Sequence, residues 1–397
     1  MRQRIATLAV FGLLGITGRA FAQASQFGIR GLGLPGREAS AYSLGLGGAE
    51  SIFDGQSSTN PAALGTLSTA TALFTSSGDW RSSTNPAGTL STRDTRFPQI
   101  LIGGPVAHRR IALGVSYSLY TDRDFTVVSD GQASPRGVPV EVHDTLSSRG
   151  GIDDLRIGGA WVVNTRLAVG AAVHFLTGSN RLVSRRFWED TTYLSPAETA
   201  ELSYSGTGVS IGALWNPVHG VEIAASFRHD GAVGIDRDST GLGQVQFPTS
   251  SVGSVAMPTT FTAGIRAAVT SRLSLVASGI TRNWSVADSA IQAEGAPGAR
   301  NTVGINGGIE LIRNARQPLK YPLRLGAHYT TLPFLLATDP QPHEFGVSLG
   351  TGRRFAADRG GFDIAIERIW RSQGSGYTEG ATVITVGISV RPPTIGQ

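Results

Sequence analysis

The chain has 397 residues, a length that would correspond to two or three soluble domains at roughly 150 residues each. Its composition argues against them, because glycine supplies 52 residues, about 13% where roughly 7% is usual, and charged residues are only 16% where about 25% is typical. No cysteine is present, which excludes disulfides and thiolate metal sites. Beyond the N-terminal region, no apolar run approaches the roughly 18 residues of a spanning helix. These features favour a large β-barrel.

The first 22 residues have the pattern of a secretory signal peptide. Arg2 and Arg4 precede an apolar stretch over residues 5–16, and Ala20-Phe21-Ala22 forms a cleavage signature. A short buried helix is the less favoured alternative. Removing residues 1–22 deletes three arginines and no acid, so the formal charge falls from +5 to +2. We therefore expect a secreted chain with no nucleic-acid partner.

Residues 23–66 are rich in glycine, alanine and serine and precede the first predicted strand. They contain the runs Gly31–Gly36, Ser43–Ala49 and Ser58–Leu64. A barrel of about fourteen strands encloses more room than its own side chains fill. This segment is the natural candidate for a hatch that plugs the lumen.

Residues 67–391 predict a β-barrel, because stretches of about ten residues alternate apolar with small or polar positions. Strands are predicted at 69–76, 98–106, 110–120, 151–163, 166–178, 202–215, 220–229, 259–269, 272–285, 301–313, 321–331, 343–352, 361–371 and 381–391, about fourteen in all. The fold class is therefore all-β, a transmembrane antiparallel barrel with an N-terminal hatch and a short tail at 392–397.

Loop lengths separate this barrel from a soluble β-sandwich, which would have the same alternation. Long connections are predicted at 77–97, 121–150, 179–201, 230–258 and 286–300, and very short turns lie between them. Long loops on one side and short turns on the other are typical of outer-membrane barrels, where they are extracellular and periplasmic respectively. We therefore predict location in the bacterial outer membrane.

Tryptophans near the predicted strand ends support two interfacial girdles. Trp80, Trp284 and Trp370 fall at long-loop ends, and Trp161 and Trp215 fall near short turns. Scattered core tryptophans are the alternative explanation.

Charged and polar side chains alternate onto the predicted lumenal face. Six are candidate lumenal site residues: Arg156, His174, Arg228, Arg266, Arg324 and His328. Glu222, Glu310, Glu344, Asp363 and Glu367 share this face. Because unpaired buried charge is costly, we favour an ion-pair network that braces the wall over direct ligand contacts.

Two enzyme motifs occur by chance in this glycine-rich chain. Gly31-x-Gly33-x-x-Gly36 matches a dinucleotide fingerprint but lacks a βαβ context, and Gly208-x-Ser210-x-Gly212 matches a nucleophile elbow but lies mid-strand. The histidines have no metal-binding spacing. An outer-membrane phospholipase stays an alternative, although His174 and His328 are predicted to point inward rather than toward lipid. We expect no enzyme activity, cofactor or metal.

The hatch region resembles the outer-membrane long-chain fatty acid transporter (FadL) family. The resemblance rests on Gly47-Gly48-Ala49 followed by Asn60-Pro61-Ala62, and on two later stretches, Met257–Phe261 leading to Thr281–Ser285 and Tyr321–Gly326 leading to Leu332–Phe334. It covers nearly all of the mature chain.

The resemblance implies capture of hydrophobic ligands by two extracellular loops, 179–201 and 230–258. The apolar side chains that would form the capture site are Phe187, Trp188, Tyr193, Leu194, Leu242, Val245, Phe247 and Met257. Packing of the loops against one another explains these residues equally well.

The same resemblance implies binding in the lumen and lateral release into the membrane. The expected function is uptake of long-chain fatty acids or hydrocarbons by a monomer in contact with outer-membrane lipid. The alternative is a PorV-like scaffold or binding protein of the same fold without transport activity.

Overall fold

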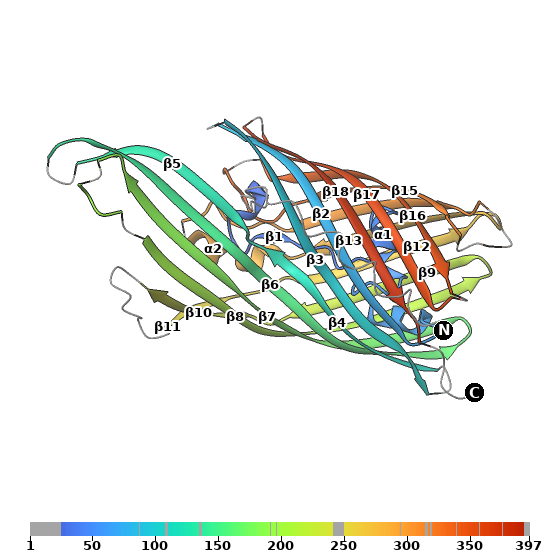
Figure 1. The fold of residues 1–397 in the computed structure, drawn as a ribbon. Coiled ribbons are helices and arrows are strands. Elements are labelled where there is room, and N and C mark those ends of the chain that lie inside the picture. The colour runs from blue at the N-terminus through green and yellow to red at the C-terminus, as the bar shows by residue number, and fades with distance from the viewer. Residues whose placement is uncertain are drawn as a thin grey trace, which may run out of the picture.

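The structure is a computed structural model in which one antiparallel sheet closes on itself as a barrel (Figure 1). It describes residues 25–392 except 87, 108–109, 135–136, 191, 196, 241–249, 294, 314–316, 318–319, 339, 357 and 375. The predicted signal peptide and nearly all of the predicted tail lie outside the described residues. Strand β18 pairs with β2 and closes the wall.

Fourteen strands form the wall within the described part of the chain. They are β2 (Thr71–Asn85), β3 (Gly88–Ala107), β4 (Ile111–Asp122), β6 (Val140–Asn164), β7 (Leu167–Trp188), β8 (Ala197–Val218), β9 (Val221–Asp230), β12 (Thr259–Ala268), β13 (Leu273–Arg282), β14 (Thr302–Leu311), β15 (Leu323–Thr331), β16 (His343–Phe355), β17 (Gly360–Gln373) and β18 (Tyr377–Val390). The predicted all-β barrel and its strand count are confirmed.

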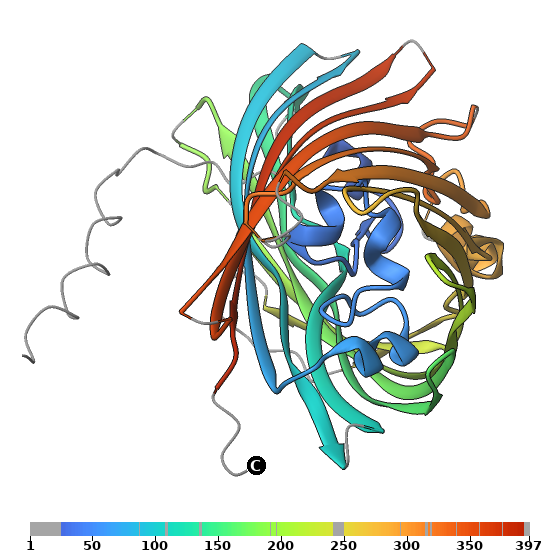
Figure 2. The ribbon, with the colours of Figure 1, turned by 90° about the vertical axis from the view of Figure 1, so that its right-hand side faces the viewer.

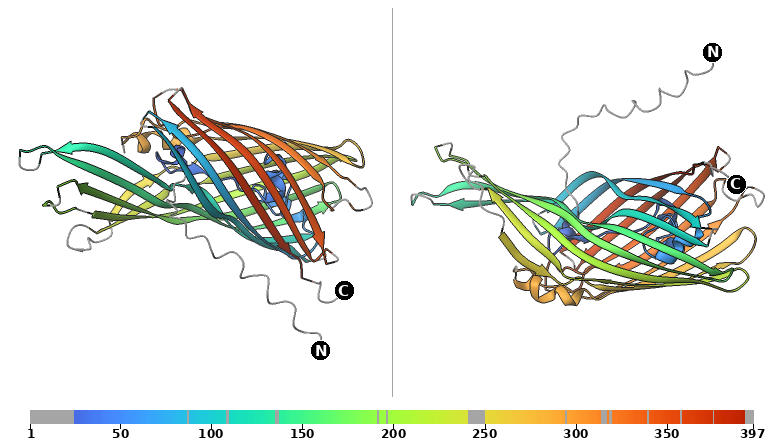
Figure 3. Two further views of the ribbon diagram at one scale, coloured as in Figure 1. Left: turned by 45° about the horizontal axis from the view of Figure 1, so that its top comes forward. Right: turned by 90° about the horizontal axis from the view of Figure 1, so that it is seen from below.

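Further strands extend the wall at the end where long loops were predicted. They are β5 (Phe125–Ala133), β10 (Val233–Thr240) and β11 (Ser250–Val255). Strand β5 pairs with β6, and β10 pairs with both β8 and β11. Figure 3 shows β5 to β8 projecting beyond the rest of the barrel.

Most of the segments that were predicted as long loops are therefore strands, and those predictions are wrong. The segment 77–97 is a hairpin of β2 and β3, and 179–201 is mostly ladder between β7 and β8. These extensions carry polar and exposed residues on both faces, so the period-two apolar pattern that marks a membrane strand is lost although the backbone pairing continues.

The outer surface carries a belt of exposed apolar side chains with aromatic rings at its margins. Tyr329, Phe345 and Trp370 are consecutive cross-strand neighbours on the long-loop side. Trp161 and Trp215 are exposed near the short turns. Trp284 does not join this belt, because it is only 1% exposed in the short helix η4 (Trp284–Ala287), packed edge-on against Phe334.

Helices in the described part of the chain are few and short. The longest that is fully α-helical is α2 (Asp288–Ala293). No helix among the described residues is long and apolar enough to cross a bilayer.

Residues 25–66, here called the lumenal segment, lie inside the ring of strands (Figure 2). The segment contains η1 (Gln26–Gly28), β1 (Leu34–Pro35), α1 (Ala41–Leu44), η2 (Ala49–Ile52) and η3 (Pro61–Thr66). Leu46, Ile52 and Phe53 pack with Leu214 and Val276 of the wall. Most residues of the segment are buried like those of a protein core, although the segment has little regular secondary structure.

A second apolar cluster closes the lumen toward the long-loop end. It joins Leu32 of the lumenal segment to Tyr120 and Ile152 of the wall, and to Trp284 and Phe334 of the loops. The β10 and β11 residues Val233, Ile235 and Val255 also belong to it. The lumen is therefore filled by side chains at this level.

Candidate functional site

The wall contains a seam between β3 and β4. Their pairing starts at Ala107 and Ile111, beside the short turn, and ends at Gln99 and Ser118. Beyond these two residues, toward the long-loop end, β3 stays paired with β2 and β4 stays paired with β6. Among the described residues, the two sheet edges above Gln99 and Ser118 therefore have no ladder between them, and Figure 1 shows the strands diverging there.

Local sequence explains where the seam begins. Pro98 lies next to Gln99 and has no N–H to donate to a ladder. The β2–β3 register shifts here, and the β4–β6 register shifts at Tyr120. Bulges of this kind bend a strand and end pairing locally. Pro98, the first residue of the predicted strand 98–106, was the signal that sequence reasoning missed.

Strand β1 of the lumenal segment lies against β4 at the seam. Leu34 pairs with Asp122, and Pro35 pairs with Thr121. The backbone N–H of Gly36 donates to the carbonyl of Tyr120 at 2.8 Å. A Cβ on Gly36 would overlap the carbonyl oxygen of Leu119, so only glycine permits this approach. The lumenal segment thus satisfies the backbone of β4 where β3 has left it.

The six predicted lumenal residues all face the interior, and five contact the lumenal segment directly. Arg228 Nη1 lies 2.8 Å from Glu38 Oε1, and Arg266 Nη1 donates a hydrogen bond to the Glu50 carboxyl group. Arg156 Nη1 donates to the carbonyl of Ser58 at 2.6 Å. Arg324 lies over the Tyr42 ring at 4.3 Å, and His328 Nδ1 is 3.4 Å from Arg37 Nη1.

The sixth residue, His174, belongs to a buried relay on three adjacent strands. Its Nδ1 lies 2.8 Å from Asp154 Oδ2, and its Nε2 lies 2.8 Å from Ser210 Oγ. Arg228 also donates to Asp154 at 2.7 Å. All three side chains are buried and Ser210 lies in the middle of β8, so the relay is placed to brace the wall.

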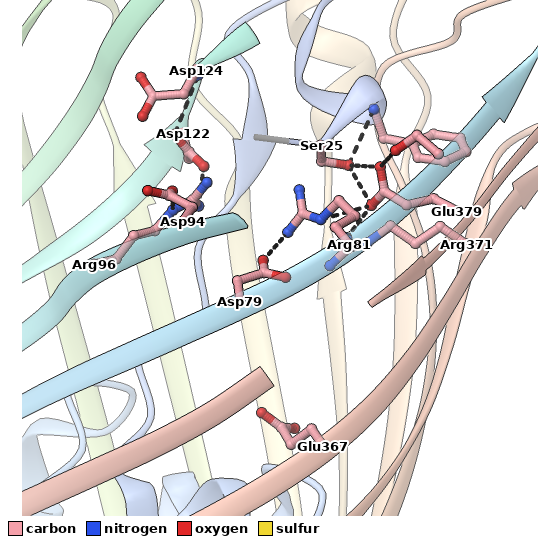
Figure 4. Close-up of polar contacts among 12 residues, drawn as sticks. Ser25, Asp79, Arg81, Asp94, Arg96, Asp122, Asp124, Glu367, Arg371 and Glu379 are labelled. Carbon is pink, nitrogen blue, oxygen red and sulfur yellow. Dashed lines mark hydrogen bonds and ion pairs between the residues drawn. The ribbon is translucent and has the colours of Figure 1, made fainter. Parts of the chain in front are cut away.

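The start of the lumenal segment is held by a cluster at β2, β17 and β18 (Figure 4). Ser25 Oγ donates to both carboxylate oxygens of Glu379, at 2.8 and 2.9 Å, and the Gln26 N–H donates to Oε2 at 3.0 Å. Arg371 Nη1 lies 2.5 Å from Glu379 Oε1, and Arg81 approaches the same oxygen at 3.5 Å. A buried carboxylate with two guanidinium groups fixes this end of the segment.

The predicted hatch motif lies against glycines of the wall. Asn60 caps η3 by accepting from the Ala62 N–H at 3.0 Å, and its amide donates to the Ile52 carbonyl at 2.9 Å. Cβ atoms added to Gly170 and Gly212 would overlap this turn. Pro61 is buried at the start of η3, Gly47 and Gly48 have positive φ, and Ala49 is fully buried. A Cβ on Gly326 would overlap the backbone of Gly47.

Glu50 lies in the lumenal segment near the short-turn end. Burial raises the pKa of its carboxyl to about 8, although Arg266 opposes that shift. A cavity of about 220 Å³ opens beside it, lined by Tyr42, Asp54 and Glu310 among others.

A second cavity, of about 110 Å³ and here called the upper cavity, lies between the lumenal segment and the wall. Arg37, Glu38, Arg228, Arg282 and Trp284 contribute to its lining. Sequence reasoning did not single out Arg282 or Trp284 as lumenal, because both lie at the end of a predicted membrane strand.

The predicted capture residues do not form one groove in the described part of the chain. Phe187 and Leu194 are 48% and 80% exposed, and the rings of Trp188 and Tyr193 pack together at 5.1 Å. Met257 is only 4% exposed and belongs to the apolar cluster below the loops. Leu242, Val245 and Phe247 lie outside the described residues.

Solved structures similar to this chain include FadL-like barrels, so the resemblance is confirmed at the level of the fold. A Pseudomonas aeruginosa FadL homologue matches with a TM-score of 0.63 at 13% identity, covering 90% of this chain and 99% of that one. The P. putida toluene transporter TodX matches at 0.58, with 13% identity over 90% and 99%. The Ralstonia pickettii toluene transporter TbuX matches at 0.56, with 15% identity over 89% and 99%.

The chain belongs to the BamG family, whose sequence profile matches residues 1–352. No curated protein is similar enough in sequence to count as a match. The similar structures are transporter and channel barrels rather than enzymes. At these identities they establish the fold, and substrate and mechanism require separate arguments.

Proposed function

We propose that this chain is a bacterial outer-membrane barrel that passes hydrophobic small molecules inward and releases them sideways through the β3–β4 seam. In this proposal the lumenal segment is a hatch, and its strand β1 is the part that closes the seam. The observation that carries the proposal is the meeting of a broken wall ladder and β1 at Thr121 and Asp122.

An apolar route to the seam supports lateral release over passage through the centre. The cluster below the loops includes Leu32, Tyr120 and Ile152, which adjoin β1 and β4. The centre of the lumen is charged, and a hydrocarbon there would displace water from charged groups without replacing their hydrogen bonds, which is costly. In this proposal a hydrophobic molecule that enters from the loops meets the apolar cluster below them first, and that cluster reaches the seam at Tyr120 and Ile152.

The apolar belt supports location in a membrane, and the transporter neighbours agree with it. Barrels of this kind place their longer extensions outside the cell. On that orientation β5 to β8 project outward, and the cavity beside Glu50 faces the periplasm.

Transfer across an asymmetric membrane tests the proposal. Simple phospholipid vesicles are unsuitable, because toluene and fatty acids cross them unaided. Vesicles with lipopolysaccharide in the outer leaflet, with and without the barrel, should take up labelled toluene or oleate faster when the barrel is present. Equal rates would overturn the proposal.

The alternative is a scaffold of the same fold, and the projecting strands favour it. Val128, Leu146 and Phe187 are exposed there beyond the belt, and exposed apolar side chains of this kind suit protein contacts. Equal uptake rates, together with a stable complex that Val128→Ser and Phe187→Ser disrupt, would support the scaffold instead.

A further inference from the structure

The upper cavity collects hydrogen-bond donors that no described residue satisfies. Trp284 is 1% exposed, and its indole Nε1 has no acceptor. Arg228 is 6% exposed, and its Nη2 likewise has none, although its other nitrogens are bonded. Buried donors are nearly always paired in folded proteins, so two on one cavity point to a missing acceptor.

A third donor adjoins them at the end of β13. Arg282 is half-buried and lines the same cavity. It makes no hydrogen bond or salt bridge to any residue that the structure describes, whereas the neighbouring Arg228 and Arg37 each have carboxylate partners. Glu38 and Asp230 are charged neighbours of Arg282 but neither is bonded to it, so its guanidinium can donate to an anionic group inside the barrel.

The acidic residues of the cavity do not supply the missing acceptor. Glu38 is paired with Arg228. Glu344 is bound by Arg371 at 2.5 Å and by His328 at 2.9 Å. Both carboxylates are occupied by cations, so the electrostatic cost of bringing another anion beside them is reduced.

The size and the remaining lining limit what could bind. A cavity of about 110 Å³ has room for roughly eight water molecules. The Trp284 ring and Ile280 provide apolar contact, and Thr260, Thr262 and Asn306 provide polar contact. This room suits a small molecule with an acidic head and a compact apolar body, and it does not suit an extended acyl chain.

We infer that the upper cavity binds a small carboxylate, with Trp284, Arg282 and Arg228 donating to the carboxylate oxygens. A carboxylate accepts several hydrogen bonds and pairs closely with guanidinium, so it satisfies all three donors together. This inference names a ligand class for the lumen of the transporter proposed above, and in that respect it rests on the proposed function.

Benzoate is a suitable probe, and toluene is its neutral counterpart of nearly the same shape. Equilibrium dialysis of the purified full-length barrel in detergent should show saturable binding of labelled benzoate and much weaker binding of toluene. Trp284→Phe removes the N–H but keeps an aromatic ring against Phe334, and Arg282→Gln removes the charge. Each should weaken benzoate binding about tenfold or more, as expected for a lost hydrogen bond to a charged group.

Two matched variants test whether the effect is local. Trp370→Phe and Arg368→Gln change the same residue types on β17, where Trp370 is exposed and Arg368 bonds Thr382 in an exposed contact. Both should bind benzoate as the unaltered protein does. Retention of the folded barrel's fast migration on unheated gels shows that each variant has folded.

Three outcomes would overturn the inference: no saturable benzoate binding, binding that Trp284→Phe and Arg282→Gln leave unchanged, or toluene binding as tight as benzoate. Competition by palmitate that depends on the same two residues would overturn the small-ligand class. The two proposals fail separately. Toluene transfer without benzoate binding removes this inference alone, whereas benzoate binding without any transfer removes the proposed function and leaves the site.

Discussion

Asn60 Oδ1 lies where a Cβ on Gly212 would be, so the turn that begins η3 sits against a wall position that has no side chain. Gly212→Ala should therefore displace the lumenal segment at a cost of about 2 kcal/mol, as overpacking of a core does. Gly307→Ala is the control, because a Cβ there meets nothing within 4 Å. The melting temperature in detergent should fall for Gly212→Ala and stay unchanged for Gly307→Ala. Equal melting temperatures for all three proteins would contradict this packing.

Asn60 itself should contribute through two bonds. Asn60→Ala removes the cap of η3 and the bond to Ile52, so we expect a loss of about 1–2 kcal/mol. Asn164→Ala removes a similar turn bond, from the Arg166 N–H at an exposed position, and should cost less. Denaturant unfolding measures both. A larger loss for Asn164→Ala would refute the central role given to Asn60.

Much of the barrel could be predicted from sequence because residues alternate between the lipid face, which favours apolar side chains, and the lumenal face, which favours small or polar ones. Strands such as β9 and β15 follow that alternation, and lumenal polar residues such as Arg228 and Arg324 follow from the same register. Beyond the belt both faces of β7 and β8 meet water, so the pattern disappears and 179–201 was wrongly taken for a loop.

The seam and the upper cavity could not be predicted in the same way. Pro98 indicates a break in a strand, but which neighbouring strand separates depends on register. Trp284 sits where an interfacial tryptophan is expected, and only the tertiary fold shows that it turns inward to Phe334. Features that depend on contacts distant in sequence leave no periodic signal.

Glu379 should fix the start of the lumenal segment. Glu379→Gln removes the charge that Arg371 and Arg81 share and weakens the acceptor for Ser25, so we expect a loss of about 3 kcal/mol. Hydrogen exchange at the amides of residues 26–28 should become faster. Glu201→Gln, at an exposed position on β8, is the control and should not change this exchange. Unaltered exchange in Glu379→Gln would show that the segment is held elsewhere.

Stability should depend on pH through Glu50, whose pKa is raised by burial to about 8. An unfolded glutamate titrates near about 4.3, so the folded protein keeps a proton that the unfolded chain has released between these values. The contribution of Glu50 to the free energy of unfolding is therefore greatest below about pH 4.3, and it falls as the pH rises to about 8. Glu50→Gln should flatten that decline, as followed by denaturant midpoints from pH 5 to 8. A decline of the same slope in Glu50→Gln would contradict the assignment.

The central claim is that hydrophobic molecules leave through the seam only when β1 separates from β4. Pro35 and Thr121 are direct partners, and the chain has no cysteine, so Pro35→Cys with Thr121→Cys supplies the only two thiols. The most direct test is toluene transfer into lipopolysaccharide-bearing vesicles by this double variant, measured oxidised and then reduced, beside the two single variants. We predict that the disulfide stops transfer, that reduction restores it, and that the single variants are insensitive to oxidation. Transfer by the fully cross-linked protein at the reduced rate would contradict the account.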